Sequence, residues 1–482
     1  MQEDFARHVK KRFGKDIVAV RYCMSAFGGS WEGAYDITPF VKSDAIDILC
    51  AQPSYGRRVP SLPTAVRLPL ESFHRNGKLF LNEFDLRTYG AMTAWETELD
   101  TMSYSRALDD PMWCTINRKL AGQMYARRMG WWYLDMAGGW FEPDGIAADI
   151  GDTVAAGRVL AASRPSKWRP DVAIVIDEDG ALLRNTISGA HHYNADESCL
   201  MGEQTQVLAA SGVPCEKWLM QDWLEDPSLA KRYKTVLFFG MYDIDDRRAA
   251  LLDALRTEGR TLVFMAGTGA ARGVERLGFC LGEKPFPAKH ETIAEPALKW
   301  NMNSLMHARK IGMIGVNTGW PWQFNSPSRL YLEPASGQKP MARFTEDGMI
   351  AVAERADAGA KLVYVAAYGG LTPDYFHHLV KDSGAYVPTD GHGLEIDMNG
   401  DFISIHCLVP GHYDFMLPQE CEVVNMKTGK TEAVSGKVLS LDLEAGETVW
   451  FRMRCLEAGR LSGTFLWKAM SLALTAELNT LK

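Results

Sequence analysis

The chain alternates short, continuously apolar runs with helical patterns over most of its length, and this alternation restricts it to the α/β fold class. Continuous runs, unlike alternating ones, are typical of strands that are buried on both faces of a parallel sheet. Polar residues follow each run, so they are expected at the carboxyl ends of the strands, where parallel sheets carry their functional sites. In the first part of the chain the runs are DIVAVRY (16–22), AIDILCAQ (45–52), KLFLNEFD (78–85) and GWWYLDM (130–136), with helices expected over 5–13 and 112–129.

The 482 residues divide into three patterned segments and a tail, which agrees with about three domains for this length. Residues 1–165 supply four βα units, half of the eight that a (β/α)8-type barrel contains. Residues 170–388 predict an open, flavodoxin-like parallel sheet. Residues 390–456 carry short alternating strands with a KTGK turn, a hairpin signal, and predict a small antiparallel β-sandwich. A helix-like apolar tail covers 457–482. The expected fold is therefore a partial barrel, an α/β domain and a β-sandwich.

Composition excludes several classes of protein. A hydrophobic fraction of 46% excludes intrinsic disorder, and 52 basic against 60 acidic side chains argue against a general nucleic-acid binder. There is no stretch of 18 uncharged apolar residues, so no membrane-spanning helix is expected, and the first residues resemble no signal peptide. The nine cysteines are scattered without a CxxC pair, which indicates reduced thiols in a cytoplasmic protein and no zinc site. No cofactor is expected.

The run GKLFLNEFDLRTYG (77–90) is the most informative in the chain. Within a strand, Glu83 and Asp85 point to one side. Arg87, two residues beyond Asp85, can hold a carboxylate ionised and oriented through charge-assisted hydrogen bonds. An anionic carboxylate at the mouth of a barrel is what the nucleophile of a glycosidase requires. A structural Glu–Arg pair at a strand end explains the same residues, and the sequence alone does not separate the two interpretations.

A second cluster, GWWYLDMAGGWFEPDG (130–145), packs five aromatic residues around a Gly-Gly bend. Aromatic faces stack on sugar rings, and a carboxylate such as Asp135 accepts hydrogen bonds from sugar hydroxyls. Trp131 and Tyr133 are expected in the core. Trp140 follows the Gly-Gly pair in a loop and is the better candidate for contact with a ligand.

Other candidate groups have weaker support. The exit of the second strand offers Gln52, Tyr55 and Arg57 as hydroxyl partners, with solvated loop residues as the alternative. GTGAARG (267–273) has GxGxxxG spacing and lacks the context of a dinucleotide-binding turn, so a tight turn is favoured. The remaining candidates are a metal site at His191 and His192 and a stacking platform at Trp320 and Trp322, for both of which structural roles are favoured.

The two strand-end clusters, in this order, resemble the seventh and eighth strands of clan-A (β/α)8 glycoside hydrolases. The remainder resembles the trimerisation and C-terminal domains of family 42 β-galactosidases. The motifs that carry this resemblance are NEFDLRT (82–88), WWYLDMAGGWF (131–141), RRAALLDALRTEGRTLVF (247–264), GGLTPDYFHHLVKDSGAYVPTDG (369–391) and DFISIHCLVPG (401–411).

The resemblance implies a retaining β-galactosidase-like enzyme with Glu83 as nucleophile and Trp140 in the sugar pocket, with Asp85, Arg87, Tyr55 and Asp135 as further substrate-binding candidates. It also implies a homotrimer. The first strand corresponds to the family's fifth, so the acid/base that the family carries on its fourth strand is expected upstream or from a partner, with Glu96 or Glu98 as in-chain substitutes. The alternative is a non-catalytic carbohydrate-binding or assembly remnant of such an enzyme. Neither interpretation requires nucleic acid or a membrane.

Overall fold

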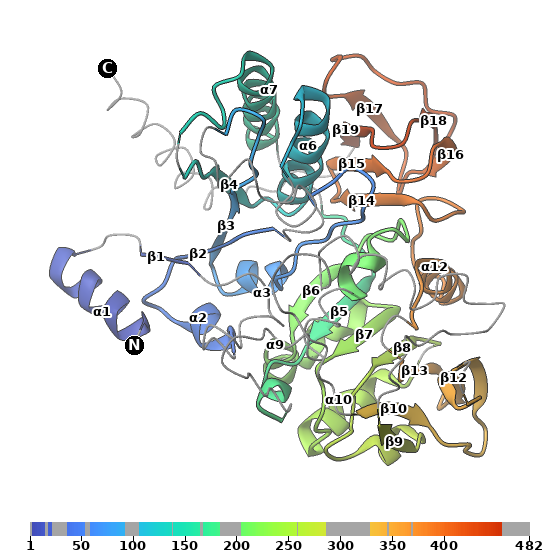
Figure 1. The fold of residues 1–482 in the computed structure, drawn as a ribbon. Coiled ribbons are helices and arrows are strands. Elements are labelled where there is room, and N and C mark those ends of the chain that lie inside the picture. Colours follow the sequence, from blue (N-terminus) through green and yellow to red (C-terminus); the bar gives the residue numbers. More distant parts are fainter. Residues whose placement is uncertain are drawn as a thin grey trace.

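The computed structural model shows three groups of strands with helices packed between and around them (Figure 1). The residues that it describes are 2–14, 18–21, 36–53, 58–91, 106–136, 138–163, 167–183, 204–257, 259–285, 328–344, 347–367 and 370–455.

The first sheet has four parallel strands in the order β1-β2-β3-β4, as the apolar runs predicted. Helix α6 begins where Asp109 accepts a hydrogen bond from the backbone N–H of Met112 at 2.8 Å, with Pro111 in the first turn. The strands are β1 (Ala19–Arg21), β2 (Ile48–Ala51), β3 (Leu79–Phe84) and β4 (Gly130–Tyr133), and the helices are α1 (Gln2–Phe13), α2 (Thr38–Lys42), α3 (Leu70–Arg75), α6 (Asp110–Ala126) and α7 (Asp144–Ala161).

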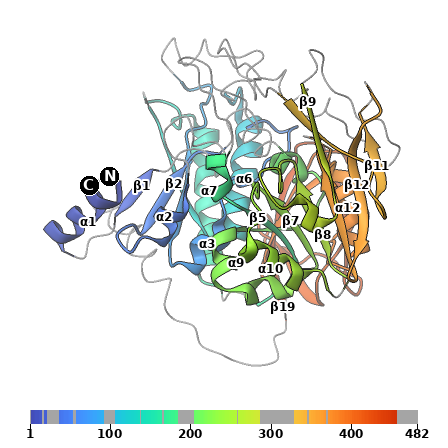
Figure 2. The ribbon, with the colours of Figure 1, turned by 90° about the horizontal axis from the view of Figure 1, so that it is seen from below.

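The second sheet is mixed. Five of its strands run parallel, in the order β6-β5-β7-β8-β13, which agrees with the predicted α/β domain. An antiparallel extension of four strands, not predicted from the sequence, continues from β13 (Figure 2). The strands are β5 (Val172–Ile176), β6 (Glu216–Leu219), β7 (Thr235–Phe239), β8 (Thr261–Met265), β9 (Leu281–Pro285), β10 (Ser328–Leu332), β11 (Lys339–Arg343), β12 (Ile350–Asp357) and β13 (Ala360–Val365). The helices are η3 (Asp179–Leu183), α9 (Met220–Glu225), η4 (Pro227–Arg232), α10 (Asp246–Leu255), η5 (Val274–Leu277) and α12 (Pro373–Asp382).

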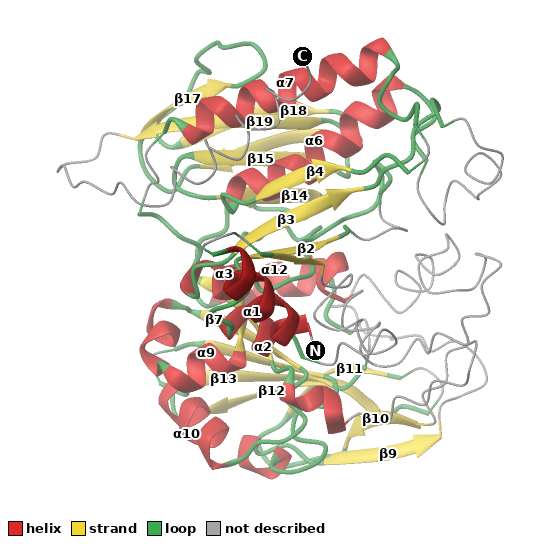
Figure 3. Cartoon of the chain, turned by 90° about the vertical axis from the view of Figure 1, so that its left-hand side faces the viewer, coloured by secondary structure: helices red, strands yellow, loops and turns green. Residues whose placement is uncertain are grey.

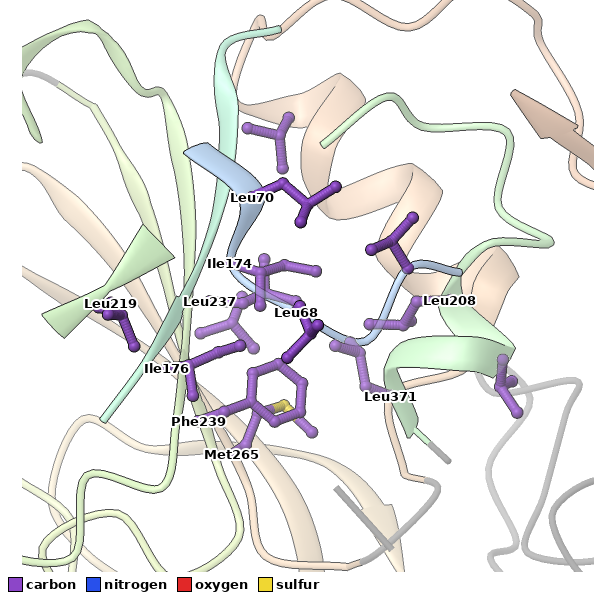
Figure 4. Close-up of a cluster of buried hydrophobic side chains, with 14 of the residues drawn as sticks. Leu68, Leu70, Ile174, Ile176, Leu208, Leu219, Leu237, Phe239, Met265 and Leu371 are labelled. Carbon is purple, nitrogen blue, oxygen red and sulfur yellow. The ribbon is translucent and has the colours of Figure 1, made fainter. Parts of the chain in front are cut away.

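The first two segments share one hydrophobic core. Leu68 and Leu70, which lie between β2 and β3, are buried in the same cluster as Ile174 and Leu237 of the second sheet (Figure 4). A fully buried leucine contributes about 1.5–3 kcal/mol to stability. This shared core fixes the first sheet relative to the second.

The third segment is antiparallel, as predicted. Its main sheet has the order β14-β15-β19-β17, and β16 pairs with β18. Helix α6 lies against it (Figure 3), and the approach requires a glycine, because a Cβ at Gly122 would lie 2.1 Å from Oγ of Ser404. The strands are β14 (Leu394–Met398), β15 (Phe402–Cys407), β16 (Gly411–Met416), β17 (Cys421–Asn425), β18 (Val438–Leu443) and β19 (Thr448–Cys455).

His406 on β15 is buried between the first and third segments, where its Nε2 donates to the carbonyl of Pro60 at 2.7 Å. Burial lowers the pKa of His406 to about 3. In the unfolded chain His406 therefore takes up a proton near pH 6.5, whereas in the folded protein it takes one up only near pH 3. The free energy of unfolding consequently falls as the pH drops from about 6.5 to about 3. We expect His406→Gln to flatten the pH dependence of the unfolding free energy there by up to about 1.4 kcal/mol per pH unit.

Denaturant titrations between pH 4 and 7 measure this slope. His412→Gln is the control, since His412 is exposed and pairs with Asp442 at the surface. Equal slopes for wild type and His406→Gln would contradict the expectation.

Candidate functional site

Glu83 lies at the carboxyl end of β3 and is only 2% exposed. Its Oε1 accepts a hydrogen bond from Nε2 of Gln52 at 2.9 Å, and its Oε2 lies 3.9 Å from Sγ of Cys50. Trp132 stands directly opposite Glu83 in the β3–β4 register, and its indole N–H donates to Cys50 at 3.0 Å. The Trp132 side chain is 39% exposed. A hydrogen-bonded carboxylate and an accessible aromatic ring therefore lie at the same end and on the same face of the sheet.

The opposite face of the same strands is an aromatic core. Phe84 stacks on Trp131 with ring centroids 5.7 Å apart, and Tyr133 packs against Phe84 edge to face. Tyr125 of α6 completes the cluster by contacting Trp131. Because successive side chains in a strand point to opposite faces, this packing holds Glu83 and Trp132 on the other side. Trp131 and Tyr133 are thus half-buried and pack against the core, on the side where the sequence placed them.

Asp85 is buried beside Glu83 and pairs with an arginine that the sequence analysis did not single out. Nη1 of Arg58 lies 2.5 Å from Oδ1 of Asp85, and Arg58 also donates to the carbonyls of Asp85 and Pro53 at 3.1 and 2.9 Å. Arg58 is completely buried. The role of Arg87 stays a prediction.

Trp140 and Asp135 join the loops that follow β3 and β4. Asp135 accepts hydrogen bonds from the backbone N–H groups of Gly138 and Trp140 at 2.6 and 3.0 Å. The carbonyl of Trp140 accepts from the hydroxyl of Thr88, and the Arg87 guanidinium lies 5.8 Å from the Trp140 ring centroid. Trp140 was expected in a loop as a candidate for contact with a ligand, and its side chain is fully buried. In this arrangement Trp132 presents the accessible ring.

Several candidates from the sequence lie outside the described residues. These are Tyr55, Arg57, Glu96, Glu98, His191, His192, Trp320 and Trp322. Two residues of the site were missed. Arg58 carried no signal beyond the Arg-Arg dipeptide, and Trp132 was hidden because three successive aromatic residues obscure which one faces away from the core.

In the GTGAARG turn (267–273) after β8, backbone N–H groups donate to carbonyls of the protein itself. The backbone N–H groups of Gly269 and Ala271 donate to the carbonyls of Met241 and Tyr242 at 2.8 and 2.9 Å. Those of Thr268 and Ala270 close local turns. Such amides are not available to cradle a phosphate, so the tight-turn interpretation is the one that the geometry supports.

Two further searches concern the part of the chain that the structure describes. It contains no group of three or more His, Cys, Asp or Glu side chains arranged to hold a metal ion. It also contains no helix with the length and apolar character needed to cross a membrane.

No protein-family model matches the chain, and no curated protein matches it. Solved structures do. The β-galactosidase from Rahnella sp. R3 is similar at a TM-score of 0.54 and 12% identity, over 93% of this chain and 66% of that protein. The β-galactosidase from Bacillus circulans sp. alkalophilus gives a TM-score of 0.52 at 12% identity, over 85% and 64% of the two chains. Gan42B, a GH42 β-galactosidase from G. stearothermophilus, gives 0.50 at 11% identity, over 94% and 68%.

The chain thus spans about two thirds of the length of these structures. At such low identity the likeness shows the fold alone. The protein has the α/β architecture of β-galactosidase-like glycosidases, with parallel sheets followed by antiparallel ones.

Proposed function

We propose that this chain is a glycoside hydrolase-type protein that acts on a β-galactoside or a related β-glycoside by a retaining mechanism. Glu83 is the nucleophile in this proposal. The observation that carries it is the placement of Glu83 at the carboxyl end of a parallel strand, held by the Gln52 amide and directly opposite the exposed ring of Trp132. The β-galactosidase-like fold supports the substrate class.

The chemistry follows from this placement. The Glu83 carboxylate attacks the anomeric carbon and forms a glycosyl ester, while a carboxylic acid protonates the departing glycosidic oxygen. Water then cleaves the ester, and the same acid, now a base, takes its proton. The Gln52 amide donates to Oε1 of Glu83, which orients the carboxylate for attack.

The acid/base is proposed to come from outside the described residues. The Asp85 carboxyl group is engaged in an ion pair with Arg58, so it is not assigned the role of the acid in this proposal. We propose that the acid is supplied by a preceding segment of a longer protein or by a partner, with Glu96 and Glu98 as the in-chain alternative. In a retaining enzyme the two carboxyl groups stand roughly 5–5.5 Å apart.

A fluorinated glycosyl donor tests the nucleophile. Incubation with a 2-deoxy-2-fluoro-β-galactoside that carries a good leaving group should attach one fluorosugar per chain, on the peptide that contains Glu83. An activated leaving group needs little help from an acid, so labelling proceeds without the acid/base. Intact-protein and peptide mass spectrometry measure the result.

Glu83→Gln should abolish the label, whereas Glu142→Gln, a change at an exposed loop carboxylate, should retain it. Absence of label on wild type with galactosyl, glucosyl and mannosyl donors would overturn the proposal.

A second function, carbohydrate binding without turnover, is favoured by one observation. The other carboxylate beside Glu83, that of Asp85, is ion-paired with Arg58. The described strand end therefore has the groups of a ligand-binding surface, but its two carboxylates are not arranged as a catalytic pair. In that case Glu83→Gln would still bind sugar, and nitrophenyl glycosides would not be hydrolysed.

Both functions predict a role for Trp132. Trp132→Ala removes the accessible ring, so the affinity for a galactoside should fall by about tenfold, because an aromatic contact contributes about 0.5–1.5 kcal/mol beyond its buried area. Titration calorimetry measures the dissociation constant. Phe141→Leu, which changes an aromatic residue of the core cluster, is the control. Unchanged affinity in Trp132→Ala would exclude this ring from the binding surface.

Two further properties are proposed: a homotrimeric assembly, which follows from the resemblance, and a cytoplasmic location, which follows from the scattered cysteines. Sedimentation of the purified protein tests the first, and fractionation of the producing cell tests the second.

A further inference from the structure

Residues 58–66, here called the strap, connect the loop after β2 to the segment that leads into α3 (Figure 1). The strap begins at Arg58, the partner of Asp85, and it belongs to no helix or strand. Buried backbone outside helices and strands must find partners for its N–H and C=O groups. In the strap, side chains from the rest of the molecule supply many of them.

Lys119 of α6 holds the first half of the strap. Its Nζ donates to the carbonyls of Val59 and Leu62 at 3.0 and 2.8 Å, and its side chain is almost completely buried. Between these two carbonyls, the carbonyl of Pro60 accepts from His406 of β15. The residues immediately after Arg58 are therefore fixed by one cation and one neutral imidazole.

A buried amide–carboxylate pair holds the middle of the strap. Gln123 donates to the carbonyl of Thr64 at 2.7 Å and to Oε1 of Glu395 at 2.6 Å, and Oε2 of Glu395 accepts the N–H of Thr64 at 2.9 Å. Glu395 lies on β14 of the third segment. Burial raises its pKa to about 7, and the positive charge of Lys119 acts against this rise.

The second segment holds the far end of the strap. Gln206 exchanges two hydrogen bonds with the backbone of Ala65, both at 2.8 Å, and Lys217 donates to the carbonyl of Val66. All three segments of the chain thus meet on one stretch of backbone.

Between the strap and the first sheet lies a small cavity of about 10 Å³, room for about one water molecule, lined by Gln52 and Asn82 from the sheet side, by Ala65 and Val66 of the strap, and by Gln123. The side-chain hydrogen bonds to the strap backbone surround this cavity, so they fix the position of this part of the strap.

From these contacts we infer that Lys119 and Glu395 are positioning residues that act through the strap to hold Arg58 on Asp85, and hence to fix the turn that follows Glu83. The inference deepens the proposed function and rests on it for its consequence in catalysis. Arg58 bonds both the carboxylate and the carbonyl of Asp85, so a shift of the strap moves this turn. Removal of Lys119 takes the side-chain donor from the carbonyls of Val59 and Leu62, and we expect the strap to relax so that these carbonyls regain hydration.

The experiment compares Lys119→Met with Lys78→Met. Lys78 also donates to two backbone carbonyls, those of Ser43 and Ile46, but it lies just before β3, at the end opposite Glu83. Amide hydrogen exchange is measured on the peptide spanning residues 84–88. We expect exchange there to become at least tenfold faster in Lys119→Met and to change less than twofold in Lys78→Met.

Labelling by the fluorinated donor supplies the second readout. In Lys119→Met the first-order rate constant of labelling should fall at least tenfold while the final labelled fraction stays near that of wild type. A merely structural lysine would lower the labelled fraction instead, because fewer molecules would be folded. If Lys119→Met does not fold, His406→Phe replaces it; this change removes the donor to Pro60 together with the contact between His406 and Thr448.

The outcomes are distinguishable. Equal exchange over 84–88 in the two lysine variants overturns the inference, as does a labelling rate constant that is unchanged in Lys119→Met. An unlabelled wild type overturns the proposed function, and the exchange comparison then decides alone whether the strap positions the turn after Glu83.

Discussion

Arg58→Met is expected to lower the free energy of unfolding by about 3–5 kcal/mol, the usual result of removing one partner from a buried ion pair. Arg58 is completely buried, and its removal takes away the cation that pairs with the buried Asp85 carboxylate. The carbonyls of Pro53 and Asp85 lose their donor at the same time. Urea denaturation followed by tryptophan fluorescence measures the loss.

Two companion variants identify the cause. Adding Asp85→Asn to Arg58→Met should recover part of the loss, because the stranded charge is removed. Arg454→Met breaks an exposed pair with Glu422, whose side chains are 53% and 42% exposed, and should cost less than about 1 kcal/mol. A cost below about 1 kcal/mol for Arg58→Met would show that Asp85 does not depend on this guanidinium.

Arg248→Met is the second large loss, again about 3–5 kcal/mol at neutral pH. The guanidinium binds Asp177 with two hydrogen bonds, at 2.6 and 2.9 Å, and reaches Asp179 and Asp245 at 2.8 and 3.0 Å. Asp177 is buried at the end of β5, and burial already raises its pKa. Without Arg248 the carboxylate is left buried and unpaired.

The loss of unfolding free energy in Arg248→Met is expected to depend on pH. Removal of Arg248 raises the folded-state pKa of Asp177 further above that of the unfolded chain. The folded protein then holds a proton that the unfolded chain releases, so the deficit is small near pH 4 and grows as the pH rises. Denaturation at pH 4.5 and 7.5 measures the difference. Arg272→Met is the control, because the Arg272 side chain, which pairs with Asp243, is 61% exposed. A deficit in Arg248→Met that does not change with pH would contradict the assignment.

The strands of the first sheet were predictable because each is a short apolar run between polar turns. KLFLNEFD gave β3 within one residue at each end, and GWWYLDM gave the start of β4. Strand β6 was not predicted, because its sequence EKWL does not read as apolar. It is buried only because Glu216 pairs with Arg232 and Lys217 reaches the backbone of Val66. Such compensation comes from tertiary structure and leaves no local pattern.

The site was predictable to the same extent. The apolar run of β3 predicts where this strand ends, so the position of Glu83 at its carboxyl end followed from the sequence pattern. Arg58 reaches Asp85 across 27 residues of chain, and this contact depends on the path of the chain after β2. Burial of Trp140 depends on how the loops after β3 and β4 meet through Thr88. Loop-to-loop geometry of this kind is absent from any single segment.

The strap also bears on the order of events during folding. Its partners are remote in sequence: Thr64 bonds Glu395 across 331 residues, and Pro60 bonds His406 across 346. Contacts of such separation form slowly, because the intervening chain must first be organised. Helix α6 and strands β14 and β15 must therefore exist before residues 59–64 find their donors and acceptors. During synthesis on the ribosome, the turn beside Glu83 gains its final support only after more than four fifths of the chain has emerged.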